Sequence, residues 1–130
     1  MISRQFTNTF TKSLTVAALA AGLAASAAYG QTFLTEDEML AAFPGHQVQG
    51  TNKAGKPWVQ VYSAGGGKHS GKYNGVEGSG KYKGKWMVKD GKWCEQVGDW
   101  SGCYNFVRKN DKTFIAYKDG QKQREWMITK

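Results

Sequence analysis

The sequence predicts a mainly β protein: a small antiparallel barrel with one short N-terminal α-helix. Apolar and polar residues alternate with a period of two from residue 47 onward, which is typical of half-buried strands. Turn signals rich in glycine recur about every ten residues, a spacing typical of a meander that closes, or nearly closes, into a lipocalin-like barrel. A capping box ahead of these strands predicts the one helix.

The first thirty residues are predicted to be a removable export signal. Arg4 and Lys12 give it a positive start without any acid, and residues 14–25 are apolar but shorter than the roughly 20 residues that span a bilayer. Small residues follow, so we expect cleavage near Gly30–Gln31 or Ala27–Ala28. The protein is then periplasmic or secreted, with no membrane span after the signal is removed.

Residues 31–130 are expected to form a single domain closed by a disulfide. The formal charge falls from +8 to +6 on signal removal, because Arg4 and Lys12 each carry one positive charge. Cys94 and Cys103 both remain, and in an oxidising compartment such a pair is most simply a disulfide. For a closed loop of about ten residues, the chain-entropy model gives about 2.5–3 kcal/mol of stabilisation.

The helix is predicted to begin after Thr35. The Thr35 hydroxyl can accept a hydrogen bond from the amide of Glu38, whose carboxylate can accept one from the amide of Thr35. Pro44 and Gly45 end the run. We therefore expect about two turns of helix, packed over one end of the sheet.

Five stretches are predicted to be strands. They are Pro57–Ala64, Lys81–Lys89, Cys103–Arg108, Thr113–Lys118 and Gln123–Ile128. Period two places Trp58, Gln60 and Tyr62 on one face of the first strand. Tight hairpin turns are expected at Asp90-Gly91 and Asp119-Gly120, and a turn or flexible loop at Gly65-Gly66-Gly67.

The tripeptide Gly-Lys-aromatic occurs four times, ending at Tyr73, Tyr82, Trp86 and Trp93. In one interpretation, glycine makes a turn or bulge, lysine covers the exposed side and the aromatic ring fills the core. In the other, rings and lysines together form a binding surface. Tyr82 and Trp86 share a face opposite the lysines, which favours the first interpretation.

Basic residues gather between Lys68 and Lys92, and the candidate binding residues there are Lys81, Lys83, Lys85, Tyr82 and Trp86. Outside the cytoplasm, the partners expected for them are an anionic envelope polymer or lipid, or another protein, and no nucleic acid. The alternative is a solvated basic face that keeps the protein soluble.

Catalytic motifs are nearly absent. Gly66–Tyr73 and Gly75–Tyr82 approach a phosphate-binding loop, but each has Tyr where Ser or Thr must reach magnesium. His46 and His69 lie far from the cysteines, without a local cluster of carboxylates. We expect no catalytic residue, no metal and no cofactor, so the protein is predicted not to be an enzyme.

A series of residues runs through the whole exported chain: Leu34-Thr35-x-Asp37-Glu38, Pro44-Gly45, Trp58 and Tyr62, Gly84-x-Trp86, Asp90-Gly91-x-x-Cys94, Cys103-Tyr104 and Asp119-Gly120. This order resembles small exported proteobacterial proteins grouped as a domain of unknown function, the DUF995-like set. The resemblance covers about residues 32–128. It implies a lipocalin-like β barrel with one disulfide and no assigned catalytic residues.

A second, shorter resemblance concerns Ser79-Gly80-x-Tyr82, Trp86 and Lys89-x-Gly91. These positions are similar to the Ser-Gly-x-x-Tyr and Trp-x-Lys-Gly loops of periplasmic C-type lysozyme inhibitors. The resemblance implies that Ser79 and Tyr82, with Lys89 nearby, would enter an enzyme cleft.

The function expected from the sequence is that of an exported binding module for an envelope component or a small ligand. An inhibitor of a cell-wall hydrolase and a polyanion-binding surface protein are the alternatives. Aromatic residues are numerous enough either to fill the barrel interior or to line a ligand site: Trp58, Tyr62, Tyr82, Trp86, Trp93, Trp100, Tyr104 and Trp126.

Overall fold

The computed structural model describes residues 32–130, in which one helix and eight strands occur. They are α2 (Glu36–Ala42), β2 (Gln47–Thr51), β3 (Pro57–Tyr62), β4 (Ser70–Glu77), β5 (Gly80–Lys89), β6 (Lys92–Val97), β7 (Trp100–Arg108), β8 (Thr113–Lys118) and β9 (Gln121–Ile128). The expected signal over residues 1–30, with its cleavage sites, lies outside this part. Within residues 32–130, no helix is both long and apolar enough to cross a membrane.

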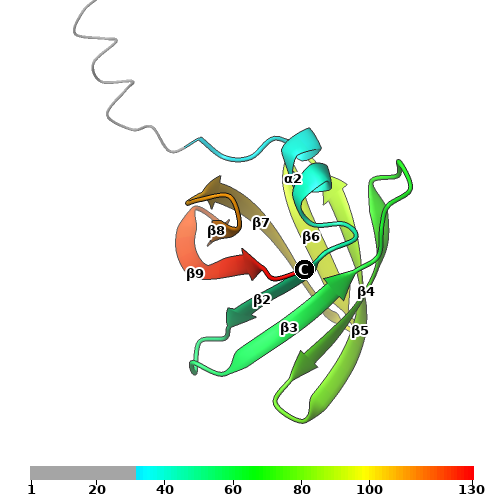
Figure 1. Ribbon diagram of the computed structural model, residues 1–130, viewed down its shortest axis with the longest axis vertical. Coiled ribbons are helices and arrows are strands. Elements are labelled where there is room, and N and C mark those ends of the chain that lie inside the picture. The colour runs from blue at the N-terminus through cyan, green and yellow to red at the C-terminus, as the bar shows by residue number, and fades with distance from the viewer. Residues whose placement is uncertain (1–31) are drawn as a thin grey trace, which may run out of the picture. The chain divides into compact units, whose positions relative to one another are not determined.

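The strands pair in chain order and form a closed antiparallel barrel (Figure 1). The last strand pairs with the first through Val48 with Ile128 and Gln49 with Met127. Side chains alternate across the wall, so that in β5 Trp86 and Val88 are buried while the lysines are exposed. The predicted fold class, a small meander barrel with one helix, is confirmed.

The strand prediction was incomplete. The structure adds β2, β4 and β6, and β4 lies in a glycine-rich stretch for which no strand was predicted. Three predicted boundaries were also wrong: β3 ends at Tyr62, β7 begins at Trp100 and β9 begins at Gln121. The turns at Asp90-Gly91 and Asp119-Gly120 are confirmed, and both aspartates have positive φ (54° and 53°).

Glycines in the strands provide room for aromatic rings on the neighbouring strand. Gly75 pairs with Tyr82 and Gly84 pairs with Tyr73 in the β4–β5 register. A Cβ on Gly75 would lie 2.2 Å from Cζ of Tyr82, and one on Gly84 would lie 2.5 Å from Cζ of Tyr73. β4 is therefore a strand despite its glycines, because only glycine leaves space for these rings.

These contacts decide between the two interpretations of the Gly-Lys-aromatic repeat. Tyr73, Trp86 and Trp93 are buried in the barrel, which confirms that the aromatic residues point inward. The prediction that glycine makes a turn or bulge was wrong for Gly71 and Gly84, which lie inside β4 and β5.

The predicted disulfide is present. Cys94 on β6 and Cys103 on β7 are directly paired in the sheet, and their Cα atoms are 4.0 Å apart. Their neighbours Trp93 and Glu95 point into the barrel. The bridge therefore ties two adjacent strands together on the outer side of the wall.

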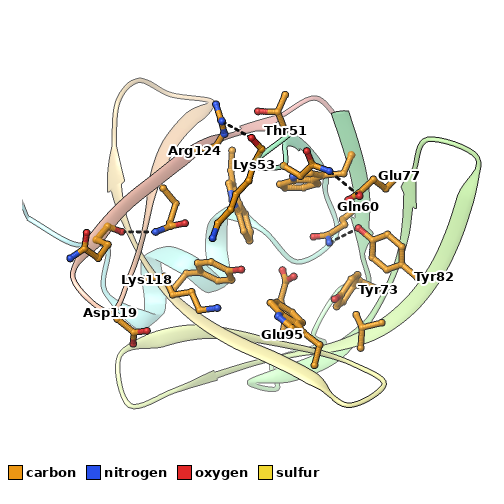
Figure 2. A pocket seen from close by; sticks show the side chains of 18 residues that line it. Thr51, Lys53, Gln60, Tyr73, Glu77, Tyr82, Glu95, Lys118, Asp119 and Arg124 are labelled. Carbon is orange, nitrogen blue, oxygen red and sulfur yellow. Dashed lines mark hydrogen bonds between the residues drawn. The ribbon is translucent and has the colours of Figure 1, made fainter. Parts of the chain in front are cut away.

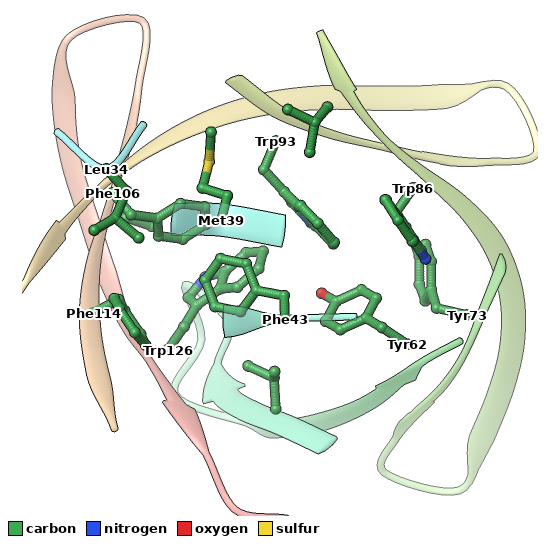
Figure 3. Close-up of a cluster of buried hydrophobic side chains, with 13 residues drawn as sticks. Leu34, Met39, Phe43, Tyr62, Tyr73, Trp86, Trp93, Phe106, Phe114 and Trp126 are labelled. Atoms are coloured by element: carbon green, nitrogen blue, oxygen red, sulfur yellow. The ribbon is translucent and has the colours of Figure 1, made fainter. Parts of the chain in front are cut away.

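The helix closes one end of the barrel. Both hydrogen bonds of the capping box form, from the Thr35 amide to Glu38 Oε1 (2.8 Å) and from the Glu38 amide to Thr35 Oγ1 (3.1 Å). Phe43, just after the helix, is fully buried and contacts five aromatic rings, which belong to Tyr62, Trp93, Phe106, Phe114 and Trp126. Figure 3 shows this ring at the centre of the hydrophobic core.

Candidate functional site

The end of the barrel opposite the helix contains a cavity of about 890 Å³. Its mouth lies among the turns that follow β2, β4, β6 and β8. The lining side chains, drawn in Figure 2, come from all eight strands or their turns: Thr51, Asn52, Lys53, Trp58, Gln60, Tyr73, Glu77, Tyr82, Glu95, Val97, Trp100, Tyr104, Lys118, Asp119, Gln121, Gln123, Arg124 and Trp126. A cavity of this size accommodates a small organic molecule.

Aromatic rings form the walls of the cavity. Trp126 contacts Trp58 edge-on at 5.3 Å between ring centroids, and it contacts Tyr104 at 5.2 Å. At the mouth, the ammonium of Lys118 lies 5.5 Å from the ring of Trp100 and 6.0 Å from that of Tyr104. These walls offer a ligand both apolar contact and the negative faces of π systems.

The floor of the cavity carries a buried carboxyl group. Glu95 follows Trp93 by two residues on β6, so period two turns both side chains inward, and Glu95 is only 4% exposed. Its Oε2 accepts a hydrogen bond from Trp93 Nε1 (2.9 Å) and is also hydrogen-bonded to the hydroxyl of Tyr62. Figure 2 shows the carboxyl group pointing into the cavity.

A chain of hydrogen bonds links Glu95 to the cavity wall. The Tyr62 hydroxyl contacts both Glu95 Oε2 and Gln60 Oε1, and Gln60 Nε2 donates to the Tyr82 hydroxyl (2.9 Å). A hydroxyl has one proton, so Tyr62 cannot donate to both acceptors. All of these hydrogen bonds form when the Glu95 carboxyl is protonated. Its O–H then donates a hydrogen bond to the Tyr62 hydroxyl, and the Tyr62 hydroxyl donates one to Gln60 Oε1.

Burial raises the pKa of the acidic side chains around the cavity floor. It raises the pKa of the Glu95 carboxyl above the usual 4.5, although hydrogen bonds from Tyr62 and Trp93 oppose the shift. Burial and then the charge of Glu95 raise the pKa of Tyr62 and Tyr73, and raise the pKa of Tyr104 to about 12. The tyrosines therefore stay neutral, and Glu95 is the group on the floor that can titrate.

One polar group of the floor lacks a hydrogen bond of good geometry. The Tyr73 hydroxyl is buried and meets no partner at full hydrogen-bond geometry within residues 32–130, although it lies close enough to Glu95 for each group to shift the pKa of the other. An unpaired buried hydroxyl costs about 1–3 kcal/mol, so such a group marks a place where water or a ligand completes the structure. Tyr73 lines the cavity, which places this unused hydrogen-bonding capacity at the site.

The rim carries charges of both signs. Arg124 Nη2 donates to the carbonyl of Lys53 (3.1 Å), which links β9 to the turn after β2. Glu77 accepts from Asn52 Nδ2 (3.0 Å). Lys118 and Asp119 complete the charged rim.

The candidate binding residues from the sequence do not share one surface. Lys81, Lys83 and Lys85 are exposed on the outside of β5. Tyr82 points inward and lines the cavity, whereas Trp86 is fully buried and stacked on Trp93 at 4.8 Å. The lysines and the two aromatic rings therefore lie on opposite sides of the barrel wall.

The candidate inhibitor residues are also separated. Ser79 is exposed in the turn before β5, and Lys89 ends the same strand. Ten residues of strand, at about 3.3 Å each, place them about 30 Å apart. Tyr82 lies near the Ser79 end, so a loop formed by all three residues is not assembled.

Sequence reasoning missed Glu95 and Tyr73 as site residues, although it placed Gln60 on the same face of its strand as Trp58 and Tyr62. A signal for Glu95 was present, because an acid two residues after a core tryptophan in a strand must point inward. The Gly-Lys-aromatic repeat predicted Tyr73 as an inward ring, but its place in the cavity could not be found because its own strand, β4, was not predicted.

The remaining observations concern metals and relatives. Among residues 32–130, no group of three or more His, Cys, Asp or Glu side chains could hold a metal ion. Comparison of the chain with protein-family models and with curated proteins finds no match.

Proposed function

We propose that this is an exported binding protein that takes a small, partly apolar molecule into the open end of its barrel. The observation that carries the proposal is the cavity itself, which joins aromatic walls to a floor of convergent polar groups. Ligand sites in proteins have this composition: mostly apolar, with a few placed hydrogen-bonding groups.

If only the stability of the fold mattered, the open end of the barrel would be packed with apolar side chains. A barrel of eight strands can be filled by its own side chains, as this one is near Phe43. At the open end, Gln60 and Glu95 are buried instead, and burying a carboxyl group without a cationic partner is costly. Among residues 32–130, the one ion pair joins the exposed side chains of Lys109 and Glu125, so it does not involve Glu95. We attribute the retained polar floor to ligand binding.

Export is part of the proposal and rests on two supports. A disulfide joins Cys94 to Cys103, and structural disulfides persist in oxidising compartments. The first thirty residues carry the features of a signal peptide. Fractionation of cells that produce the full chain, followed by mass spectrometry of the mature N-terminus, tests this part.

A pair of matched substitutions tests binding in the cavity. Val97→Phe adds a ring to the cavity lining, whereas Val61→Phe adds the same ring to the exposed outer face of β3. We expect Val97→Phe to weaken binding of a small apolar probe at least tenfold, about 1.4 kcal/mol, and Val61→Phe to leave it unchanged. Equal binding by both variants, each shown to be folded by its melting curve, would contradict the proposal.

A second candidate function, binding of polyanions, is favoured by one specific arrangement. Lys72 on β4 lies directly opposite Lys85 on β5, and Lys89 lies opposite Lys92 across the next hairpin. Like charges facing each other destabilise a sheet, so an anionic partner would relieve the repulsion. The exposed lysines of β5 extend this basic face.

Retention on a heparin column tests the polyanion candidate. Replacing Lys81, Lys83 and Lys85 with Gln should lower the eluting salt concentration more than replacing Lys56, Lys112 and Lys122, which removes the same charge elsewhere on the exposed surface. Equal shifts for the two triple variants would show that only net charge matters, and this candidate would fail.

A further inference from the structure

We propose that the cavity selects an organic cation, an amine whose ammonium group lies against Glu95 and whose hydrocarbon part lies among Trp58, Tyr104 and Trp126. This inference rests on the proposed function, since it names the class of ligand for the same cavity. Three features of the described residues carry it: the position of the carboxyl group, the rings around it and the absence of a cation beside it.

The carboxyl group is placed to receive a ligand. The hydrogen bonds that Glu95 shares with Trp93 Nε1 and with the Tyr62 hydroxyl both involve Oε2. Oε1 is therefore the oxygen presented to the cavity, into which Figure 2 shows the group pointing. Trp93 and Tyr62 are themselves fully buried, so Glu95 is held in this orientation before any ligand arrives.

No residue of the described chain supplies a countercharge to Glu95. Lys, Arg and His side chains among residues 32–130 form no ion pair with it. In a cavity of low dielectric, an ionised carboxylate is stabilised most by a cation at hydrogen-bond distance. An ammonium group that enters through the mouth would provide that cation together with hydrogen-bond donors for Oε1.

The surrounding rings suit the same chemistry. An ammonium is attracted to the face of Trp or Tyr within about 6 Å of the ring centroid. Lys118 already makes this contact at the mouth, with Trp100 and Tyr104. Deeper in the cavity, Trp58 and Trp126 also line the space, and neither ring makes a cation–π contact with a side chain of residues 32–130.

Two other ligand classes fit less well. An anion at the floor would lie against Glu95, and the cations that could hold it, Lys53, Lys118 and Arg124, lie at the rim. A neutral polyol could bond to Gln60, Tyr73 and Glu95, but it would bring no positive charge to pair with an ionised carboxylate. Both classes serve as comparison arms of the test.

Binding of an amine should release a proton. The groups that face Glu95 from β3, β4, β5 and β7 are Tyr62, Tyr73, Tyr82 and Tyr104, and burial keeps all four protonated. The titratable proton on the floor is therefore that of the Glu95 carboxyl. When an ammonium arrives, this O–H bond breaks, the proton passes to the buffer and the carboxylate pairs with the ligand.

The first test compares three molecules of nearly equal shape by calorimetry on the full-length protein. They are cyclohexylmethylamine, cyclohexanemethanol and cyclohexanecarboxylate. We expect the amine to bind at least tenfold more tightly than the other two, a difference of about 1.4 kcal/mol. Equal or tighter binding of the alcohol or the carboxylate would overturn the cation inference and leave the cavity proposal standing. Failure of all three to bind would overturn both.

The second test uses Glu95→Gln, which keeps the shape of the side chain and removes its charge. The variant should lose at least tenfold in affinity for the amine and change by no more than about twofold for the alcohol. Proton release on binding, measured at a series of pH values from 4.5 upward in buffers of different ionisation enthalpy, should be present for the natural protein and absent for the variant. Unchanged amine affinity, or proton release that persists, would refute the role of Glu95. Retained alcohol binding shows that the variant cavity is intact.

Discussion

The two ends of the barrel are built from the same strands and have opposite interiors. At the helix end, Phe43 enters the barrel and contacts five aromatic rings, and the interior is a packed core. At the other end, the inward positions are held by residues such as Gln60, Tyr82 and Glu95, around a cavity of about 890 Å³. Along β6, a single residue separates Trp93 in the core from Glu95 at the floor.

This contrast shows that strand alternation alone does not decide whether a barrel interior is a core or a site. Alternation only chooses which side chains point inward. What fills the helix end is a side chain from outside the sheet, because Phe43 follows α2 rather than lying in a strand. At the cavity end, the residues from outside the strands that line the opening are polar or charged: Asn52, Lys53 and Asp119.

The largest effect should come from truncating Phe43, the side chain that fills the helix end of the barrel. Phe43→Ala removes a fully buried ring and leaves a void, so we expect the free energy of unfolding to fall by about 3–5 kcal/mol. Tyr82→Ala removes a half-buried ring from the cavity wall, where water can enter, so a loss of only about 1 kcal/mol is expected. Urea unfolding measures both. Equal losses would break the distinction between the two ends.

The disulfide should come next. Replacing Cys94 and Cys103 with Ser should lower the free energy of unfolding by about 2.5–3 kcal/mol, because the unfolded chain regains the freedom of a closed loop. The bridge lies outside the cavity lining, so probe binding by the folded variant should be unchanged. Lost binding in a variant that still melts cooperatively would show that the disulfide also determines the shape of the cavity.

Two glycine substitutions on neighbouring strands compare a tightly packed position in the barrel with a position beside the cavity. In Gly84→Ala, the new Cβ would lie 2.6 Å from the carbonyl oxygen of Gln96 as well as against buried Tyr73, so backbone must move and we expect a loss of about 2–3 kcal/mol. In Gly75→Ala, the three closest atoms belong to the Tyr82 ring, which can shift into the cavity, so a loss of about 1 kcal/mol is expected. Thermal melting tests the order, and the reverse order would contradict the account.

The smallest effect is the pH dependence due to Glu95. Burial raises its pKa above the usual 4.5, so the folded protein holds this proton more tightly than the unfolded chain does. Its contribution to stability is therefore complete below the unfolded value and is lost as pH rises through the folded value. Urea unfolding at a series of pH values should show the natural protein losing stability relative to Glu95→Gln as pH rises. A constant difference between the two would contradict the raised pKa.

The sequence allowed the fold to be predicted wherever local chemistry determines local structure. The capping box at Thr35 and the Asp-Gly turns depend on a few adjacent residues, and all were found as predicted. β4 could not be predicted in this way, because Gly71 and Gly75 are explained only by the rings of Trp86 and Tyr82 on the next strand. Those contacts depend on sheet register, which no short stretch of sequence specifies.

The candidate site was predicted only in part. Alternation correctly turned Tyr82 inward and put Trp58 and Gln60 on one face, which the structure shows to line the cavity. It could not show how the inward residues divide between core and cavity, because that depends on how far Phe43 reaches into the interior. The lysines of β5 form a conspicuous run of charge in the sequence, yet they lie on the outside of the barrel wall. Glu95, in contrast, is the single acidic residue of β6, so no cluster of charge marks it as a site residue.

The central claim, that the open end of the barrel is the binding site, is tested most directly by the five tryptophan side chains. Three of them, Trp58, Trp100 and Trp126, line the cavity, whereas Trp86 lies in the core. The indole N–H signals in a ¹H–¹⁵N spectrum, assigned with single Trp→Phe variants, can be followed while cyclohexylmethylamine is added. The account predicts saturable shifts for the three cavity tryptophans and little change for Trp86. Shifts centred on Trp86, or no saturable shift at Trp58 and Trp126, would contradict it.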